Sequence, residues 1–296
     1  MGTAVSLDPL VTALLDLARE LPALPRPVLV GGGFGLYLKQ RHLEDDGAED
    51  TLIPGELWPP ARATEDIDLL LPPEVIVSLE HMRAIREALD RLGYEPAVKY
   101  FQFVKQTRNG PVKVDLLTCD VPEELSDEVK IKSMRVRPAG DVQLHAYLTR
   151  EALELGLSPS EFVLRGTRSD GTEDELGVRV PNSFTYLLMK LHAFRDRVHD
   201  ERKHLASHHA LDLYRIVAMM TRDEYDLVRE LAQRHAGTRA VQEASVAVVK
   251  QFGDDRSAGM IRLLTGARDA GLPRAAVRGD EFREVLGELF PQREVV

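Results

Sequence analysis

Residues 63–71 read Ala-Thr-Glu-Asp-Ile-Asp-Leu-Leu-Leu. Acidic and apolar side chains alternate along it, which predicts a strand with one buried face. Asp66 and Asp68 then share the polar face and stand about 7 Å apart, at roughly 3.3 Å of rise per residue. Ile67 and Leu69 occupy the opposite, packed face. We therefore expect a sheet strand that presents two carboxylates on one side.

A third carboxylate stands in a second strand-like stretch, residues 112–117, which reads Val-Lys-Val-Asp-Leu-Leu. Its apolar residues share one face and leave Asp115 on the other. The preceding Asn109-Gly110 pair is a hairpin signal and predicts pairing with a strand at residues 100–106. Three carboxylates on neighbouring strands suit Mg²⁺ or Mn²⁺, because such ions take oxygen ligands from protein, water and phosphate. The predicted metal ligands are Asp66, Asp68 and Asp115.

A glycine run lies upstream of these strands. Residues 27–30 are strand-like, Gly31, Gly32 and Gly33 follow, and residues 36–39 are helix-like. Backbone N–H groups at such a helix start can approach an anion closely, which suits a nucleotide phosphate. An Asp-x-Asp alone is common on surface strands, and three glycines alone can form a simple turn. The order of glycine turn, helix, paired acids and single acid is what indicates a site.

With these parts in this order, the chain resembles the DNA polymerase β-like nucleotidyltransferase superfamily. Within it, residues 62–69 (Arg-Ala-Thr-Glu-Asp-Ile-Asp-Leu) are similar to the Arg-x-Thr-x-Asp-hydrophobic-Asp phrase of the AbiEii/MenT-type toxin nucleotidyltransferases. The resemblance implies that the three aspartates are catalytic. It also implies nucleotide-binding roles for Arg62, Thr64 and the glycine run.

A second match to this family lies in the C-terminal half. Residues 190–197 and 211–214 resemble its Lys-Leu-x-Ala-x-x-x-Arg and Asp-Leu-Tyr segments. A lysine beside a core face usually extends to solvent, but the resemblance gives Lys190 a phosphate contact. It places Asp212 in the same catalytic site and gives Arg197 an anion contact. The chain departs from the family pattern in having Arg215 where a second aspartate often stands, Gly-Gly-Gly where Gly-Ser is common, and an acidic insertion at residues 44–60.

The predicted fold class is α/β (α+β). We expect an N-terminal polymerase β-like nucleotidyltransferase domain with a mixed sheet at residues 1–180, followed by an all-helical C-terminal domain at residues 181–296. Amphipathic patterns predict helices at residues 8–20 and 74–92. A hairpin is expected between residues 162 and 180, and Asn182 or Ser183 should cap the first C-terminal helix. The acidic, proline-rich insertion reads as a loop of about twenty residues that Trp58 holds in place.

Composition bounds the class of protein. The chain has 296 residues, 44% hydrophobic and 29% charged, which is typical of a globular protein. A single cysteine, Cys119, excludes an intramolecular disulfide, and we interpret it as buried filler. The sequence shows no membrane span or signal peptide, which favours a cytoplasmic location.

The net charge of −10 argues against broad wrapping of nucleic acid. Basic residues at 130–137 and 195–209 could still form a local positive rim, although a solvated charged surface is the ordinary interpretation of such runs. His204 and His208 have a zinc-capable spacing, but no third ligand suggests itself. A solvated basic helix is the preferred interpretation of these histidines.

The resemblance implies transfer of a nucleotide from an NTP to the 3′ end of tRNA, by a toxin that is opposed by a cognate antitoxin protein. Other acceptors keep the same chemistry, namely an antibiotic-like small molecule or a protein hydroxyl. A catalytically silent nucleotide-binding module is an alternative of another class. A nucleotide-sugar glycosyltransferase would use the Asp-x-Asp but would leave the glycine turn and Lys190 without a shared purpose.

Overall fold

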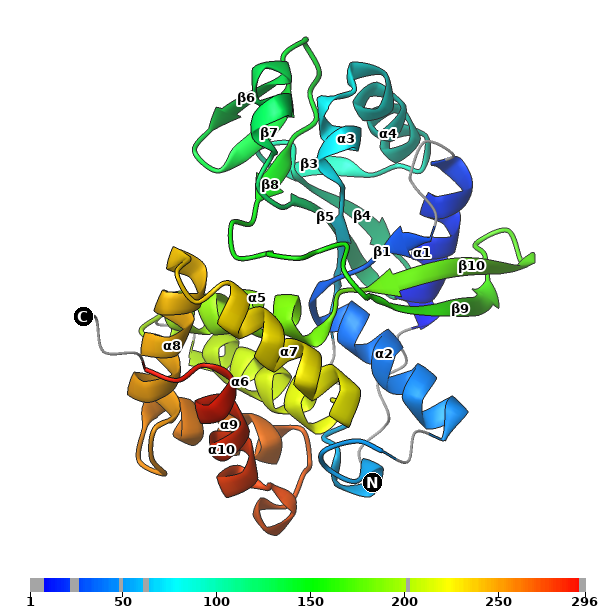
Figure 1. Ribbon diagram of the computed structural model, residues 1–296. Helices are drawn as coiled ribbons and strands as arrows, with labels where there is room; N and C mark the ends of the chain where they lie inside the picture. Colours follow the sequence, from blue (N-terminus) through cyan, green and yellow to red (C-terminus); the bar gives the residue numbers. More distant parts are fainter. Residues whose placement is uncertain (1–7, 22–26, 48–49, 61–63, 201–202, 293–296) are drawn as a thin grey trace. The chain divides into compact units, whose positions relative to one another are not determined.

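The computed structural model describes residues 8–21, 27–47, 50–60, 64–200 and 203–292 (Figure 1). It is a mixed α/β structure that divides into two compact units. The first, here called the sheet unit, comprises residues 4–39 and 63–181. The second, the helical unit, comprises residues 1–3, 40–62 and 182–296. Among the described residues, no helix combines the length and the apolar character needed to cross a membrane.

Two sheets form the sheet unit. In the larger one the strand order is β3-β4-β5-β8-β7-β6, and β2 pairs with β5; the smaller one has the order β1-β10-β9. The elements of this unit are α1 (Asp8–Glu20), β1 (Val28–Leu29), the first part of α2 (Gly32–Asp46), β2 (Asp66–Leu70), α3 (Pro73–Val77), α4 (Leu79–Arg91), β3 (Glu95–Val98), β4 (Gln102–Thr107), β5 (Gly110–Thr118), the 3-10 helix η2 (Glu123–Glu128), β6 (Val129–Lys132), β7 (Arg135–Pro138), β8 (Ala146–Leu148), β9 (Ser160–Thr167) and β10 (Glu173–Val180).

Local sequence explains most of these elements. The Asn109-Gly110 turn closes the β4–β5 hairpin, with Gly110 at a φ of 111°, as the sequence predicts. The second predicted hairpin is also present, as β9 and β10. The helix expected at residues 74–92 is in fact two helices, because Ser78 leaves helical geometry and its hydroxyl caps α4 by accepting from the His81 N–H at 3.2 Å.

Alternation gives the larger sheet one apolar and one polar face. Ile67 and Leu69 of β2 are buried, as are Val114 and Leu116 of β5 and Val136 of β7. These side chains belong to one core cluster with residues of α1, α3 and α4. The opposite face is therefore left for polar side chains.

Helices make up most of the other unit. Its first long helix, α5 (Ser183–Arg197), begins at Asn182, whose Oδ1 accepts the Thr185 N–H at 2.9 Å, as predicted. Most residues of this helix are buried, including every residue from Ser183 to Leu188, which is typical of a helix at the centre of a bundle. The other elements of the unit are the rest of α2, the 3-10 helices η1 (Gly55–Leu57) and η3 (Arg274–Ala276), α6 (Lys203–Ala218), α7 (Arg222–Arg234), α8 (Arg239–Phe252), α9 (Ala258–Asp269) and α10 (Gly279–Leu289).

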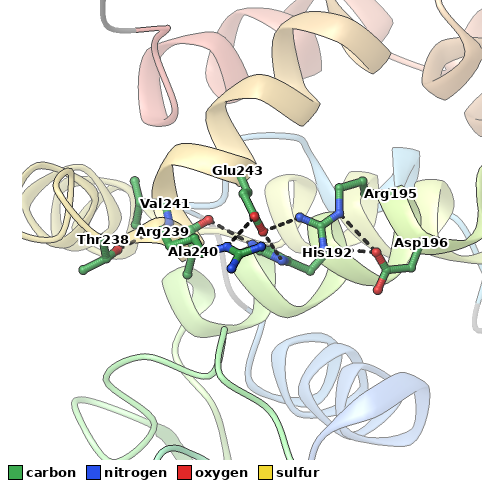
Figure 2. A network of polar contacts seen from close by, with 8 residues as sticks. All are labelled: His192, Arg195, Asp196, Thr238, Arg239, Ala240, Val241 and Glu243. Atoms are coloured by element: carbon green, nitrogen blue, oxygen red, sulfur yellow. Dashed lines mark hydrogen bonds and ion pairs between the residues drawn. The ribbon is translucent and has the colours of Figure 1, made fainter. Parts of the chain in front are cut away.

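An ion-pair network joins α5 to α8. Glu243 of α8 accepts from Arg195 of α5 and from Arg239 at 2.7 Å, and the His192 ring contacts the Ala240 carbonyl oxygen at 2.9 Å (Figure 2). The two arginines lower the pKa of Glu243. This network anchors the start of α8 on the central helix.

The acidic insertion belongs to the helical unit. Residues 44–46, expected in a loop, are the last turn of α2. Leu52 N–H donates to the Met220 carbonyl oxygen at 2.8 Å, and Thr51 pairs with Thr221. Trp58 is buried and donates from Nε1 to the Ile53 carbonyl oxygen at 2.8 Å, so it holds the loop in place as predicted. The described elements after β10 are helices, but residues 40–62 share their unit, and a division at residues 180 and 181 remains a prediction.

Candidate active site

Strand register brings the three predicted acids together in the sheet unit. β2 and β5 are parallel neighbours, and Asp68 is the direct partner of Asp115. Asp66 lies two residues before Asp68 and therefore on the same face. Paired residues on adjacent strands are about 5 Å apart, so the carboxylates form one acidic cluster.

The cluster carries negative charge that the protein only partly balances. Burial, followed by the charges of Asp68 and Asp66, raises the pKa of Asp115 to about 7, against opposing contributions from a Gln102 hydrogen bond and from Lys113. Oδ1 of Asp66 and Oδ1 of Asp115 are buried without a hydrogen-bond partner among the described residues. Two oxygens in this state are costly unless a cation or donor meets them.

Lys113 is a site residue that sequence reasoning missed. Its Nζ donates to Glu65 Oε2 at 2.9 Å and lies 3.6 Å from Asp66 Oδ1, and the Glu65 hydrogen bond raises its pKa. The sequence feature that could have identified Lys113 is its position two residues before Asp115, because this spacing places both side chains on the same face of β5. Thr64, predicted to bind nucleotide, accepts the Asp66 N–H at 3.4 Å and so supports the start of β2.

The glycine turn contacts the acidic cluster directly. Gly31 N–H donates to the Asp68 carbonyl oxygen at 2.8 Å. Gly32 begins α2 with a φ of +63°, and a Cβ there would lie 1.8 Å from Asp68 Oδ2. Gly33 follows in the first turn of α2. The helix start predicted for this run is confirmed, and the anion beside it is the carboxylate of Asp68, which the positive end of the helix favours.

The donor set fits a divalent cation that keeps ligands of its own. Within the described residues, no group of three or more histidine, cysteine, aspartate and glutamate side chains is arranged to hold a metal ion, so water and substrate would have to complete the ligand set. Asp66 Oδ1 and Asp115 Oδ1, which accept no hydrogen bond from the described residues, and the neighbouring Asp68 supply a partial oxygen shell. Mg²⁺ commonly binds in this way, through one or two carboxylates, waters and substrate phosphate.

The predicted C-terminal site residues lie in the helical unit. Lys190 of α5 is buried and donates to Asp212 Oδ2 of α6 at 2.7 Å. Arg215 Nη1 lies 3.7 Å from Asp212 Oδ1, and its Nη2 donates to Gln40 Oε1 at 2.6 Å. The structure thus brings Lys190 and Asp212 together. Arg215, which the sequence marked only as a departure from the family pattern, stands in the same buried cluster.

Other predicted residues have less defined surroundings. Arg197 is half-buried in the last turn of α5 and has no ion-pair partner among the residues that the structure describes. Arg62 lies outside the described residues, as does the side chain of His204, one of the two histidines with zinc-capable spacing.

Comparison with known proteins adds one finding. A family model described as "Nucleotidyl transferase AbiEii toxin, Type IV TA system" matches residues 56–292, which is most of the chain and includes all three acids but not the glycine turn. No curated protein and no solved structure matches the chain.

The contact between the glycine turn and Asp68 predicts a steric requirement at Gly32. Gly47 is the matched control, because its φ is +65° and a Cβ there meets nothing within 4 Å. We expect Gly47→Ala to cost about 1 kcal/mol of backbone strain. Gly32→Ala should cost about 2 kcal/mol more, because Asp68 must also move. Urea unfolding of both variants checks this, and equal losses would contradict it.

The raised pKa of Asp115 predicts how stability depends on pH in the metal-free protein. Between about pH 4 and pH 7 the folded protein holds a proton at Asp115 that the unfolded chain has lost. This contribution to the unfolding free energy therefore falls as pH rises through that window. From pH 5 to pH 8 in EDTA, wild type should lose about 2 kcal/mol more than Asp115→Asn. Urea unfolding at both pH values measures the difference, and parallel profiles would argue against it.

Proposed function

This chain belongs to the AbiEii nucleotidyl transferase toxin family of Type IV toxin–antitoxin systems, and on that premise we propose that it moves a nucleoside monophosphate from an NTP to the 3′ end of tRNA with Mg²⁺ as cofactor. The family makes the chain a nucleotidyltransferase and implies an NTP substrate and a cognate antitoxin. The acceptor, the metal and the roles of single residues are our proposal.

One observation carries the proposal, namely the acidic cluster on β2 and β5. Asp68 and Asp115 stand in register, and two oxygens of the cluster accept no hydrogen bond from the part of the chain that the structure describes. Burial, and then the charges of Asp68 and Asp66, raise the pKa of Asp115, and a bound cation would offset both effects. We assign Asp66, Asp68 and Asp115 as the ligands. When bound, Mg²⁺ supplies charge neutralisation for the triphosphate and for the leaving pyrophosphate.

The transfer itself forms one bond and breaks one. The acceptor hydroxyl oxygen bonds to the α-phosphorus of the NTP, the bond to the bridging oxygen breaks, and pyrophosphate leaves. The hydroxyl proton must go to a base. We assign this task to Asp115, whose carboxylate lies in the acidic cluster in register with Asp68.

The helical unit contains a cluster of buried charged side chains. Lys190, Asp212 and Arg215 together carry one excess positive charge. Two cations and one carboxylate thus lie close together in a buried place, where an anionic substrate group would be a favourable additional partner. We therefore retain Lys190 as a phosphate contact and Asp212 as the residue that orients it, with Arg197, Arg62, Thr64 and the glycine run as further proposed nucleotide contacts.

Labelling with each α-³²P NTP, with total tRNA present or absent, tests the acceptor. Wild type with Mg²⁺ should label tRNA from one preferred NTP, whereas Asp66→Asn should lower the rate by at least 100-fold because a metal ligand is lost. Circular dichroism and thermal unfolding should show that this variant remains folded. EDTA should abolish labelling by wild type.

Other results would change the assignment. Label on protein or on a small molecule, but not on tRNA, would keep the chemistry and replace the acceptor. A fully active and folded Asp66→Asn would remove the acidic cluster from the mechanism. The absence of label from every NTP under all conditions would favour a silent nucleotide-binding module.

The two ion pairs of Asp212, with Lys190 and with Arg215, predict different behaviour for two substitutions. Lys190→Met leaves Asp212 with Arg215, a neutral pair, so the protein should stay folded while transfer falls at least tenfold. Asp212→Asn leaves two buried cations and should cost about 3 kcal/mol of stability. Rate measurements beside urea unfolding separate the two effects. A stable Lys190→Met variant with wild-type activity would restrict Lys190 to a structural role.

A further inference from the structure

The polar face of the larger sheet extends beyond the acidic cluster. Paired residues on neighbouring strands share a face, so the register can be followed from β5 outward. Leu117 of β5 pairs with Tyr147 of β8, Tyr147 with Arg135 of β7, and Arg135 with Lys132 of β6. Leu117 lies two residues after Asp115 and on its face. The face that begins with the acids therefore ends in basic residues.

A second basic row runs beside the first. Arg137 of β7 pairs with Lys130 of β6, and each lies two residues from its basic neighbour on the same strand. The hairpin of β6 and β7 thus presents four cations on the acid face: Lys130, Lys132, Arg135 and Arg137. At roughly 4.8 Å between strands, β7 is about 10 Å from β5. A chain end that reaches the acids therefore passes close to the hairpin.

The charge of this hairpin is not balanced by carboxylates. Among the described residues, none of the four cations is in an ion pair. Lys130 and Lys132 are exposed, and Arg135 has a buried Nε without a hydrogen-bond partner. Arg137 donates from Nη1 to the Gly140 carbonyl oxygen at 2.7 Å, which fixes its guanidinium in place.

The lowered pKa of His145 is consistent with a positive electrostatic potential near the hairpin. Burial lowers the pKa of His145, and the charges of Arg135 and Arg137 lower it further. The acids of η2 precede β6 in sequence and are exposed, and η2 packs on α3 and contacts β6. None of these carboxylates forms an ion pair with the four cations among the described residues.

Aromatic side chains lie between the cations and the acids. Tyr147 is 37% exposed, and its ring centroid is 5.3 Å from that of Phe101. Cations that follow a phosphate backbone, together with an exposed aromatic ring on which a base can stack, are the combination by which proteins hold single-stranded nucleic acid.

We propose that the β6–β7 hairpin and Tyr147 bind the single-stranded 3′ end of the RNA acceptor and lead it across the sheet toward Asp115. The cations contact phosphates, and Tyr147 stacks on a base. This inference rests on the proposed function, because the RNA strand bound here is the acceptor of the nucleotidyl transfer. It also explains how a chain with a net charge of −10 holds a polyanion, because the positive charge is confined to one hairpin.

Paired charge removals test the surface. The test variant is Lys130→Ala/Lys132→Ala, and the control is Arg83→Ala/Arg108→Ala, which removes two exposed cations from α4 and the β4–β5 turn of the same unit. We expect the test variant to raise KM for tRNA on the order of tenfold and to leave KM for NTP unchanged. A plot of log affinity for RNA against log salt concentration should have a slope that is smaller in magnitude by about 1.4 in this variant. Each lost phosphate contact with a single strand accounts for about 0.7 of that change. The control should match wild type.

Tyr147 supplies an independent readout. Tyr147→Leu should weaken RNA binding on the order of tenfold, whereas Tyr147→Phe should retain it, because stacking needs the ring and not the hydroxyl. Equal losses in the two variants would contradict stacking.

Binding to a fluorescein-labelled single-stranded RNA, followed by anisotropy with the full chain and no NTP, separates this proposal from the proposed function. If wild type fails to label tRNA but the test variant still loses RNA binding relative to the control, the surface stands and the acceptor is another RNA. A rise in KM for NTP alone would show that the hairpin handles the triphosphate and would overturn the proposal. RNA affinity equal in wild type, test variant and control would overturn it as well.

Discussion

The parallel register between β2 and β5 is the constraint on which the site depends. It aligns Asp68 with Asp115 and sets every acid on the face opposite the core. A slip of one residue would turn Asp66 and Asp68 into the apolar cluster and bring Ile67 and Leu69 to the surface, so the hydrophobic pattern fixes the register. The same burial that fixes it also concentrates like charges, and Gly32 at the start of α2 offers Asp68 partial relief.

The parts of the fold that depend on short-range chemistry could be predicted from the sequence. Alternation along residues 63–71 identified both faces of β2, Asn109-Gly110 identified a hairpin, and Asn182 identified the start of α5. Each of these signals acts within a few residues of the chain, through side-chain direction, turn geometry or capping. The candidate acids followed from the same alternation.

Features that depend on long-range packing could not be predicted. The assignment of residues 40–62 to the helical unit rests on contacts with the end of α6 and the residues after it, such as Leu52 with Met220. Arg215 is 175 residues from its partner Gln40, and no local pattern marks that bond. The sequence of the basic run at residues 130–137 does not indicate which face of the sheet its cations occupy. Only the pairing through Tyr147 places its cations on the face of the acids.

The helical unit is discontinuous along the chain, and this has a consequence for how the protein can be taken apart. Residues 40–62 of the helical unit lie in sequence between the two segments of the sheet unit, 4–39 and 63–181, and the helical unit resumes at residue 182. No single cut in the gene therefore separates the two units, because a fragment that ends at residue 181 holds the whole sheet unit together with residues 40–62 of the helical unit. The chain also emerges from the ribosome with all three acids already made while most of the helical unit is still unsynthesised, so a prematurely released product would carry the acids without Lys190.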